Sequence, residues 1–220
     1  MLIIGLTGSI AMGKSTVAKM LLNNGIPMIS ADQIVHDLYE NEAVPLIEQA
    51  FPGSTENNQV NREKLLKLIL NETDGFKKLE SLIHPLVRQK EWEFIKEHKD
   101  KGADLVAIEI PLLFETGAEK LMDSVLLASA PAEVQKQRVM ARPGMTQEKF
   151  KTLLDKQMPD SEKRKKADFI VDTSCSLEET EEQLKEIIVS LKNQQPTAYD
   201  AWLNNTGDVT VSLENLKTHK

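Results

Sequence analysis

The chain reads Gly8-Ser9-Ile10-Ala11-Met12-Gly13-Lys14-Ser15 close to its N-terminus. This stretch fits the pattern G-x-x-x-x-G-K-[ST] of a phosphate-binding loop, or P-loop. The end glycines let successive backbone N–H groups approach a phosphate closely, and the following helix presents the positive end of its dipole to the anion. The motif predicts nucleotide binding, but by itself it does not separate kinases from GTPases or other ATPases.

The side chains of the loop have separate expected roles. Lys14 is expected to place its charge against the β and γ phosphates, and the Ser15 hydroxyl to ligate Mg²⁺. Thr16 is expected to support a phosphate further back. The predicted nucleotide contacts are Gly8, Ser9, Ile10, Ala11, Met12, Gly13, Lys14, Ser15 and Thr16.

The neighbouring sequence supports this interpretation over a glycine-rich turn that matches by chance. Leu2–Leu6 is an apolar run of strand length, and Ile26–Ser30 is a second one. Between them, Lys14–Asn24 carries apolar residues at helical spacing and stops at Gly25. Strand, loop, helix and strand make the βαβ unit of a parallel sheet.

The rest of the chain continues the alternation of strands and helices. Residues 31–70 are polar and mostly helical in pattern, with a break at Phe51–Ser54. Further strands are expected at Leu105–Ile110, Ser124–Ala130 and Phe169–Asp172, and further helices at Pro85–Lys99, Ala132–Arg142, Thr146–Gln157 and from the capping box at Ser176 to Lys192. The pattern predicts an α/β protein, a three-layer P-loop NTPase fold with a parallel sheet.

The last part of the chain differs in composition. After Asn193 the sequence turns polar and loses periodicity. We therefore expect a P-loop domain over residues 1–193 and a polar C-terminal tail over residues 194–220, frayed or loosely docked. Tyr199 and Trp202 could pin part of that tail to the body.

The amino-acid composition limits the kinds of partner and the cellular compartment that we expect for this protein. The 220 residues carry a formal net charge of −7, which disfavours broad contact with nucleic acid. No apolar run is long enough to span a bilayer, so we expect no membrane partner. Cys175 is the only cysteine, which excludes an intrachain disulfide and favours a reducing cytoplasm. A monomer or weak homo-oligomer is expected.

The segment after the fourth predicted strand narrows the class of P-loop protein. GTPases carry an Asn-Lys-x-Asp element there, whereas this chain continues Pro131-Ala132-Glu133-Val134. Guanine specificity is therefore unsupported, and the chain lacks the extra coupling motifs of motor and transporter ATPases. A small-metabolite kinase that uses ATP and Mg²⁺ remains.

Asp32 is the first candidate for the chemical step. It follows the strand Ile26–Ser30, so it lies at the C-terminal edge of the sheet, where ligands of parallel sheets bind. A carboxylate there could orient and deprotonate an acceptor hydroxyl. It could equally be an N-cap for the helix through Ile34 and Leu38. Spacing alone leaves both roles open.

Two other positions admit a functional and a structural interpretation. Arg138 and Arg142 are four residues apart on a predicted helix, so they share a face that could meet phosphate oxygens. They could also be a surface pair that answers Glu133. Glu109, near the end of a predicted strand, could help hold Mg²⁺ or its waters, or could be a surface acid at a strand end.

Beyond these positions the chain resembles the dephospho-CoA kinase family along nearly its whole length to about Asn193. The resemblance rests on several motifs in the right order. They are the opening G-L-T-G-S-I-A-M-G-K-S-T, Ser30-Ala31-Asp32 for a D-A-D element, His84-Pro85-Leu86-Val87-Arg88, Pro111-Leu112-Leu113-Phe114-Glu115, and Glu162-Lys163-Arg164 with Ala167-Asp168. Three positions depart from the family pattern: Ala11 stands for Gly, Ser30 for Asp, and Leu153 for Arg.

The resemblance implies a function and further site residues. It implies transfer of the γ-phosphoryl group of ATP to the ribose 3′-hydroxyl of dephospho-CoA, with Asp32 as base. It also implies that Arg138 and Arg142 belong to a helical lid over ATP, and that a helical acceptor lobe follows Asp32. In that lobe His84 and Arg88 would lie near the substrate, although a lone His is more often a cap or packing residue. Leu113 would contact the pantetheine or serve packing.

Two alternatives stay open at this point. One is another P-loop small-metabolite kinase, which would also place an Asp after the second strand. The other is a non-catalytic ATP-binding switch that signals through partners. The H-P-L-V-R and P-L-L-F-E segments weigh against the first, and Asp32 with the paired arginines weighs against the second.

Overall fold

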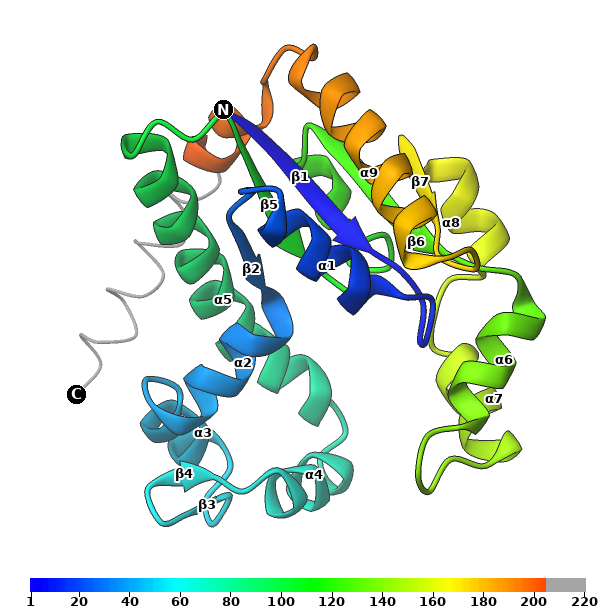
Figure 1. Cartoon of the computed structure of the whole chain (residues 1–220). Helices are drawn as coiled ribbons and strands as arrows, with labels where there is room; N and C mark the ends of the chain where they lie inside the picture. The colour runs from blue at the N-terminus through cyan, green and yellow to red at the C-terminus, as the bar shows by residue number, and fades with distance from the viewer. Residues whose placement is uncertain (205–220) are drawn as a thin grey trace. The chain divides into compact units, whose positions relative to one another are not determined.

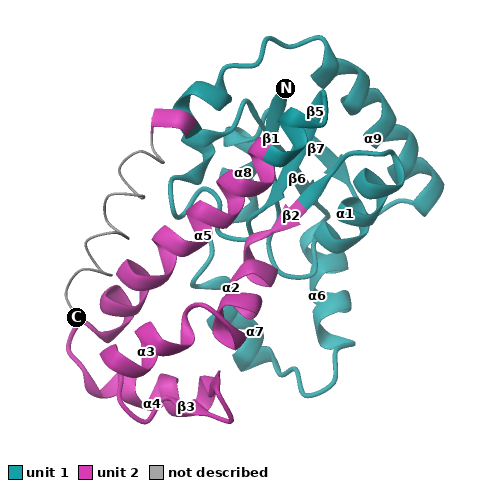
Figure 2. Cartoon of the chain, turned by 90° about the vertical axis from the view of Figure 1, so that its left-hand side faces the viewer, with its two compact units in different colours: residues 1–28, 97–202 teal, residues 29–96, 203–220 magenta. Residues whose placement is uncertain are grey.

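The computed structural model describes residues 1–204, which form two compact units (Figures 1 and 2). The first unit comprises residues 1–28 and 97–202, and the second is built on residues 29–96. Within the described residues, no helix combines the length and apolar character needed to cross a membrane.

A five-stranded sheet is the centre of the fold (Figure 1). Its strands, in spatial order, are β2 (Met28–Ser30), β5 (Leu105–Glu109), β1 (Leu2–Thr7), β6 (Ser124–Ser129) and β7 (Phe169–Asp172). The pairs β1–β5, β1–β6 and β6–β7 are parallel. The predicted α/β class with a parallel sheet is confirmed, and each strand lies within about a residue or two of its predicted range.

The helices of the first unit follow the local signals of the sequence. They are α1 (Lys14–Asn23), α6 (Ala132–Met140), α7 (Gln147–Leu154), α8 (Asp160–Lys166) and α9 (Leu177–Lys192), with a short 3₁₀ turn η1 (Ala118–Leu121). The capping box at the start of α9 is confirmed, because Ser176 and Glu179 exchange side-chain and backbone hydrogen bonds. Pro143 shortens α6, since the residue before a proline disfavours helical geometry.

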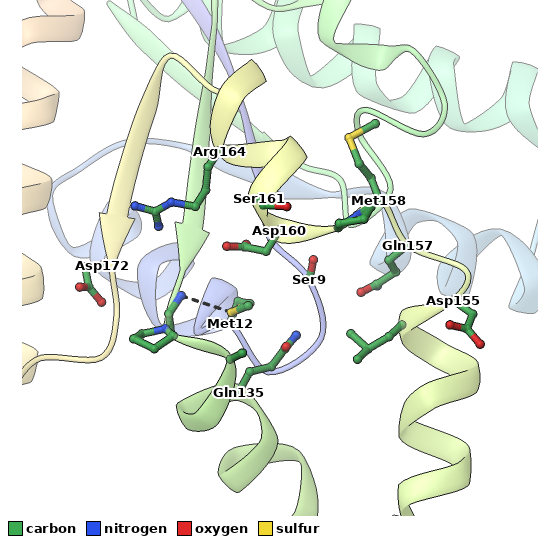
Figure 3. Close-up of a pocket in the computed structure, with 15 residues that line it drawn as sticks. Ser9, Met12, Gln135, Asp155, Gln157, Met158, Asp160, Ser161, Arg164 and Asp172 are labelled. Atoms are coloured by element: carbon green, nitrogen blue, oxygen red, sulfur yellow. Dashed lines mark hydrogen bonds between the residues drawn. The ribbon is translucent and has the colours of Figure 1, made fainter.

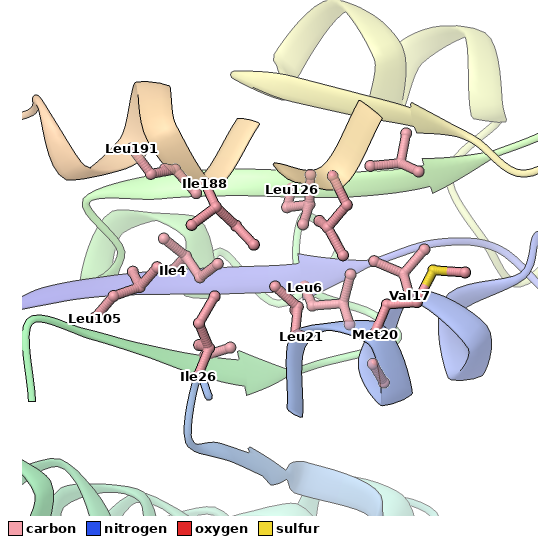
Figure 4. Packing of buried hydrophobic residues seen from close by; sticks show 14 of the residues in the cluster. Ile4, Leu6, Val17, Met20, Leu21, Ile26, Leu105, Leu126, Ile188 and Leu191 are labelled. Atoms are coloured by element: carbon pink, nitrogen blue, oxygen red, sulfur yellow. The ribbon is translucent and has the colours of Figure 1, made fainter. Parts of the chain in front are cut away.

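Side chains alternate between the two faces of β1, and those on one face form a hydrophobic core with α1 and α9 (Figure 4). Leu2, Ile4 and Leu6 point to this face and are buried. They pack with residues at helical spacing on α1 and α9, namely Val17, Ala18, Leu21, Leu184, Ile188 and Leu191. Burying these aliphatic side chains stabilises the fold by roughly 1.5–3 kcal/mol each. The P-loop thus leaves a rigid strand and enters a rigid helix.

Gly5 lies on the opposite face of β1, where Leu113 covers the strand. A Cβ built on Gly5 would lie 2.4 Å from Leu113 Cδ1, so Leu113 packs directly on the strand. The Leu113 side chain is fully buried. Leu113 therefore has the packing role, and its contact with the substrate stays a prediction.

The second unit is mainly helical and includes a small hairpin. It comprises α2 (Ala31–Glu40), α3 (Val44–Ala50), α4 (Arg62–Asn71), most of α5 (Gly75–Asp100), and the antiparallel pair β3 (Thr55–Glu56) and β4 (Gln59–Val60). Its own core gathers apolar residues from all four helices, including Ile34, Ile47, Phe51, Leu65 and Ile83. The hairpin was not predicted. Its signal is Asn57-Asn58, because both residues have the positive φ that a tight hairpin turn requires.

Helix α5 corrects the prediction that Pro85 opens a helix. The helix begins at Gly75, ten residues earlier, and carries Pro85 in its interior. An interior proline costs about 3 kcal/mol through its missing N–H and its clash with the preceding turn. Ile83, Leu86 and Ile95 are buried along the same helix, so tertiary packing offsets that cost. His84 is consequently an exposed mid-helix residue and not a cap.

The described part of the C-terminal tail is docked and not frayed, and Trp202 pins it to the body as the sequence allowed. Asp123 Oδ1 accepts a hydrogen bond from the backbone N–H of Ala198 at 2.7 Å. Residues 198–204 are helical, and Trp202 is fully buried, with its indole Nε1 donating to Leu121 O at 2.7 Å. Residues 205–220 of the predicted tail lie outside the described residues.

This docking leads to a prediction about stability. Trp202→Ala should lower the free energy of unfolding by about 3 kcal/mol, because it leaves a large cavity and an unpaired Leu121 carbonyl. For a protein of this size that corresponds to a fall in Tm of roughly 10 °C. Differential scanning calorimetry checks it. Leu203→Ala, at an exposed neighbour, is the control and should leave Tm within about 2 °C; an equal Tm for both variants would contradict the docked arrangement.

Candidate active site

The P-loop ends in a helix terminus that is open to an anion. Gly13 is the N-cap of α1, with φ of 83°, and no side chain caps the helix. The first N–H groups of α1 therefore have no side-chain acceptor, and they carry the positive end of the helix dipole. Such a helix terminus can hold an anion, and phosphate binding by the loop stays a prediction.

Close packing requires a glycine at both ends of the loop, and Gly13 also has a positive φ that favours glycine. A Cβ on Gly8 would lie 2.7 Å from Ala128 O, and a Cβ on Gly13 would lie 2.6 Å from Thr173 Oγ1. Thr173 Oγ1 also donates to Met12 O at 3.0 Å, which ties the loop after β7 to the P-loop. Thr173 was not predicted as a site residue, because nothing near it in sequence marks it.

Ala11 adopts left-handed backbone geometry, with φ of 59°. For a residue with a Cβ this conformation costs roughly 1–2 kcal/mol, whereas glycine adopts it freely. Ala11 therefore carries local strain that the Gly of the family pattern would avoid.

The side chain of Lys14 forms an ion pair with Glu109. Both side chains are largely buried, with 16% and 13% exposed. The contact arises because β1 and β5 are neighbours in register, with Leu6 beside Glu109. Ser15 lies next to Lys14 in the first turn of α1 and is exposed. The sheet thus gathers a cation, a carboxylate and a hydroxyl at the P-loop.

The two arginines of the predicted lid helix lie in different surroundings. Arg138, on α6, donates from Nη1 to Thr173 Oγ1 at 3.0 Å and from Nη2 to Thr173 O at 2.5 Å. It therefore braces the threonine that abuts Gly13. Arg142 lies beyond the end of α6 and is exposed. The prediction that both arginines sit four apart on one helix is therefore wrong.

A pocket of about 670 Å³ opens beside the P-loop (Figure 3). Its lining includes Ser9, Met12, Gln135, Gln157, Asp160 and Arg164. The buried atoms Ser9 Oγ and Asp160 Oδ1 have no hydrogen-bond partner within residues 1–204. Ser129 Oγ accepts from Arg164 Nη1 at 2.9 Å and donates to Asp160 Oδ2 at 2.7 Å. Two residues with unpaired buried oxygen atoms and the held Arg164 guanidinium thus line the pocket.

Lys163 differs from the other basic residues of α8, Arg164, Lys165 and Lys166, which are exposed. Its side chain is fully buried, and its Nζ lies 3.0 Å from Glu115 Oε1. The same Glu115 oxygen accepts from Met158 N at 2.7 Å. Two motifs of the resemblance, Pro111–Glu115 and Glu162–Arg164, are thus joined by one buried ion pair. A lysine-rich helix gave no local sign of this role.

The second unit carries the remaining candidates. Ser30 is the N-cap of α2, and Asp32 is an exposed residue of its first turn. The alternative role of Asp32 as the N-cap is therefore excluded. Arg88 Nη1 lies 3.0 Å from Glu91 Oε2. Burial raises the pKa of Glu91 to about 7, although the Arg88 charge acts in the opposite direction.

Comparison with known proteins decides the family. A family model described as dephospho-CoA kinase matches residues 2–179. The chain belongs to the dephospho-CoA kinase family. A dephospho-CoA kinase of Brucella melitensis is 52% identical over 198 residues, covering 90% of this chain and 99% of the relative. A crystal structure of TT1252 from Thermus thermophilus superposes with a TM-score of 0.74 at 37% identity, covering 86% of this chain and 97% of that chain.

A solved dephospho-CoA kinase from Campylobacter jejuni gives a TM-score of 0.60 at 28% identity, covering 86% of this chain and 96% of that one. Membership of the dephospho-CoA kinase family confirms the resemblance drawn from the motifs. Family membership does not favour either alternative, which were another small-metabolite kinase and a non-catalytic ATP-binding switch.

Proposed function

We propose that this protein transfers the γ-phosphoryl group of ATP to the ribose 3′-hydroxyl of dephospho-CoA, giving coenzyme A and ADP. The observation that carries the proposal is the Gly8–Ser15 loop, an open helix terminus with Lys14 beside it, in a chain of this family. The low cysteine content and the charge of −7 support a cytoplasmic monomer or weak homo-oligomer without nucleic-acid or membrane partners.

The donor is held by the P-loop backbone and by basic side chains. The N–H groups at the start of α1 would bind the β-phosphate, and Lys14 would bridge the β and γ phosphates. Because Lys14 is paired with Glu109 in the protein alone, nucleotide binding would exchange that partner for phosphate oxygens. Arg138 and Arg142 would offset the charge that develops on the transferred group.

Mg²⁺ fits the oxygen donors at this site. Ser15 offers an exposed hydroxyl in the first turn of α1, and Glu109 offers a carboxylate at the end of the neighbouring strand. Mg²⁺ commonly takes only one or two protein ligands and completes its shell with phosphate oxygens and water. When bound, it would neutralise charge on the β and γ phosphates.

Asp32 is the proposed general base, and His84 and Arg88 are proposed acceptor contacts. The Asp32 carboxylate is exposed in the first turn of α2, so it is free of a capping role and accessible to a substrate hydroxyl. Arg88 would contact an acceptor phosphate, with Glu91 fixing the orientation of its guanidinium.

A coupled ADP-release assay tests the proposed reaction. ADP release should depend on dephospho-CoA and exceed the rate with shikimate, gluconate or nucleoside monophosphates by at least about 100-fold, since only the right acceptor supports productive alignment. Mass spectrometry of the product should show coenzyme A. Equal or higher rates of ADP release with another acceptor would show that dephospho-CoA is not the preferred substrate.

The lid arginines lead to a kinetic prediction. Arg142→Ala should lower kcat and kcat/KM together by roughly 10²-fold, because its contact would form only in the transition state. Arg142→Lys should rescue only partly, since an ammonium group lacks the bidentate fork. Arg138→Ala should also raise KM for ATP, because Thr173 loses its brace beside Gly13.

The exposed Lys136→Ala on α6 is the control for these variants and should behave as the wild type. Steady-state kinetics with both substrates varied makes the measurement. An unchanged kcat in both arginine variants would remove these residues from the mechanism.

A further inference from the structure

The main chain of Ile10, within the P-loop, is held by two glutamine side chains. Gln157 Oε1 accepts from Ile10 N at 3.1 Å, and Gln135 Nε2 donates to Ile10 O at 2.9 Å. Figure 3 shows the two side chains coming from different segments of the chain, next to the loop. The backbone N–H and C=O groups of Ile10 are thus both hydrogen-bonded to side chains that are remote in sequence.

The burial of Gln135 indicates that this contact is built into the fold. Gln135 is only 5% exposed, whereas glutamine is mostly a surface residue. A buried amide without a partner is destabilising, so its bond to Ile10 is needed for the side chain to remain there. The neighbouring Gln137 on α6 is exposed and provides a natural comparison.

The two contacts lie next to the strained residue of the loop. Ala11 follows Ile10 and has φ of 59°, a conformation that persists in a non-glycine residue only when its surroundings impose it. On the other side, Met12 N donates to Ser9 O at 3.1 Å and Met12 O accepts from Thr173 at 3.0 Å. The peptide groups that flank Ala11 are therefore fixed on both sides.

The two glutamines also lie near the two ends of one segment of the chain, which runs from α6 through α7. Gln135 lies on α6, before Arg138 and Arg142, and Gln157 lies after α7, just before α8. The segment that carries the arginines is therefore attached to Ile10 at both its start and its end.

From these contacts we infer that Gln135 and Gln157 are positioning residues that hold the P-loop in its phosphate-binding conformation and fasten the arginine-bearing segment to it. The inference rests on the proposed function for the identity of the nucleotide. It adds that a loop with Ala11 depends on side-chain contacts to keep its shape. Neither glutamine needs to touch the phosphates.

Calorimetric titration with MgADP tests the inference without any acceptor. Gln135→Met and Gln157→Met remove the hydrogen bonds at similar volume, and each should raise Kd about fivefold, the size expected for one lost hydrogen bond. The control Gln137→Met should leave Kd unchanged. In kinetics, KM for ATP should rise while KM for dephospho-CoA stays within about twofold.

Two glutamate variants separate hydrogen bonding from mere packing. A carboxylate at position 157 can still accept from Ile10 N, whereas a carboxylate at position 135 faces the Ile10 carbonyl and cannot donate. Gln157→Glu should therefore bind MgADP at least about fivefold more tightly than Gln135→Glu. Both variants add one carboxylate next to Ile10, so the comparison varies whether that carboxylate faces the N–H or the carbonyl group of Ile10.

The inference is overturned by equal Kd values for the two glutamate variants, or by wild-type Kd values in both methionine variants. A melting curve for each variant establishes that it is folded at the titration temperature. If the wild type binds MgADP but does not phosphorylate dephospho-CoA, the proposed function fails while the titrations still decide the role of the glutamines.

Discussion

Lys14→Ala should abolish phosphoryl transfer, with kcat reduced by at least about 10³-fold, while the protein stays folded. The substitution removes the charge that the loop would direct at the β and γ phosphates. Lys14 is not part of the apolar core, so the packing of α1 against the sheet is retained. Single-turnover transfer of labelled phosphate to dephospho-CoA makes the measurement sensitive to very low rates.

The ion pair with Glu109 adds a second expectation for this variant. Without Lys14 the largely buried Glu109 carboxylate loses its partner, so Lys14→Ala should lower the free energy of unfolding by roughly 3 kcal/mol. Lys19→Ala, at an exposed position of the same helix, is the matched control and should keep full activity. Turnover at the wild-type rate in Lys14→Ala would exclude the P-loop from the reaction.

Asp32→Asn should lower kcat by roughly 10²-fold or more, the range of general base catalysis, with much less effect on KM for ATP. The amide keeps the shape of the side chain but cannot take the proton of the acceptor hydroxyl. Because Ser30 and not Asp32 occupies the N-cap position of α2, the loss of stability should be small, at most about 1 kcal/mol from the helix dipole.

Asp37→Asn, on the exposed surface of the same helix, is the control and should leave kcat unchanged. Measurements of kcat at saturating ATP and dephospho-CoA, together with melting curves, distinguish the two roles. A variant that melts at a lower temperature but retains its kcat would return Asp32 to a structural role.

The sequence determined the local parts of this protein. The P-loop, the flanking βαβ unit and the capping box at Ser176 were predictable, because each depends on residues a few positions apart. The order of the family motifs likewise indicated the dephospho-CoA kinase family before any geometry was known. Helix α6 ends two residues before its predicted end at Arg142, since helix ends depend on signals that compete over one or two residues.

Only the tertiary structure decided which distant residues meet. Lys14 and Glu109 are 95 positions apart, and Ile10 and Gln157 are 147 apart, so no periodicity relates them. The burial of Lys163 and the docking of Trp202 depend in the same way on partners contributed by other segments. Helix α5 continues through Pro85 because the packing of its apolar face outweighs the local cost. Local rules act over one helical turn, whereas the site is assembled where separate strands and helices end at one edge of the sheet.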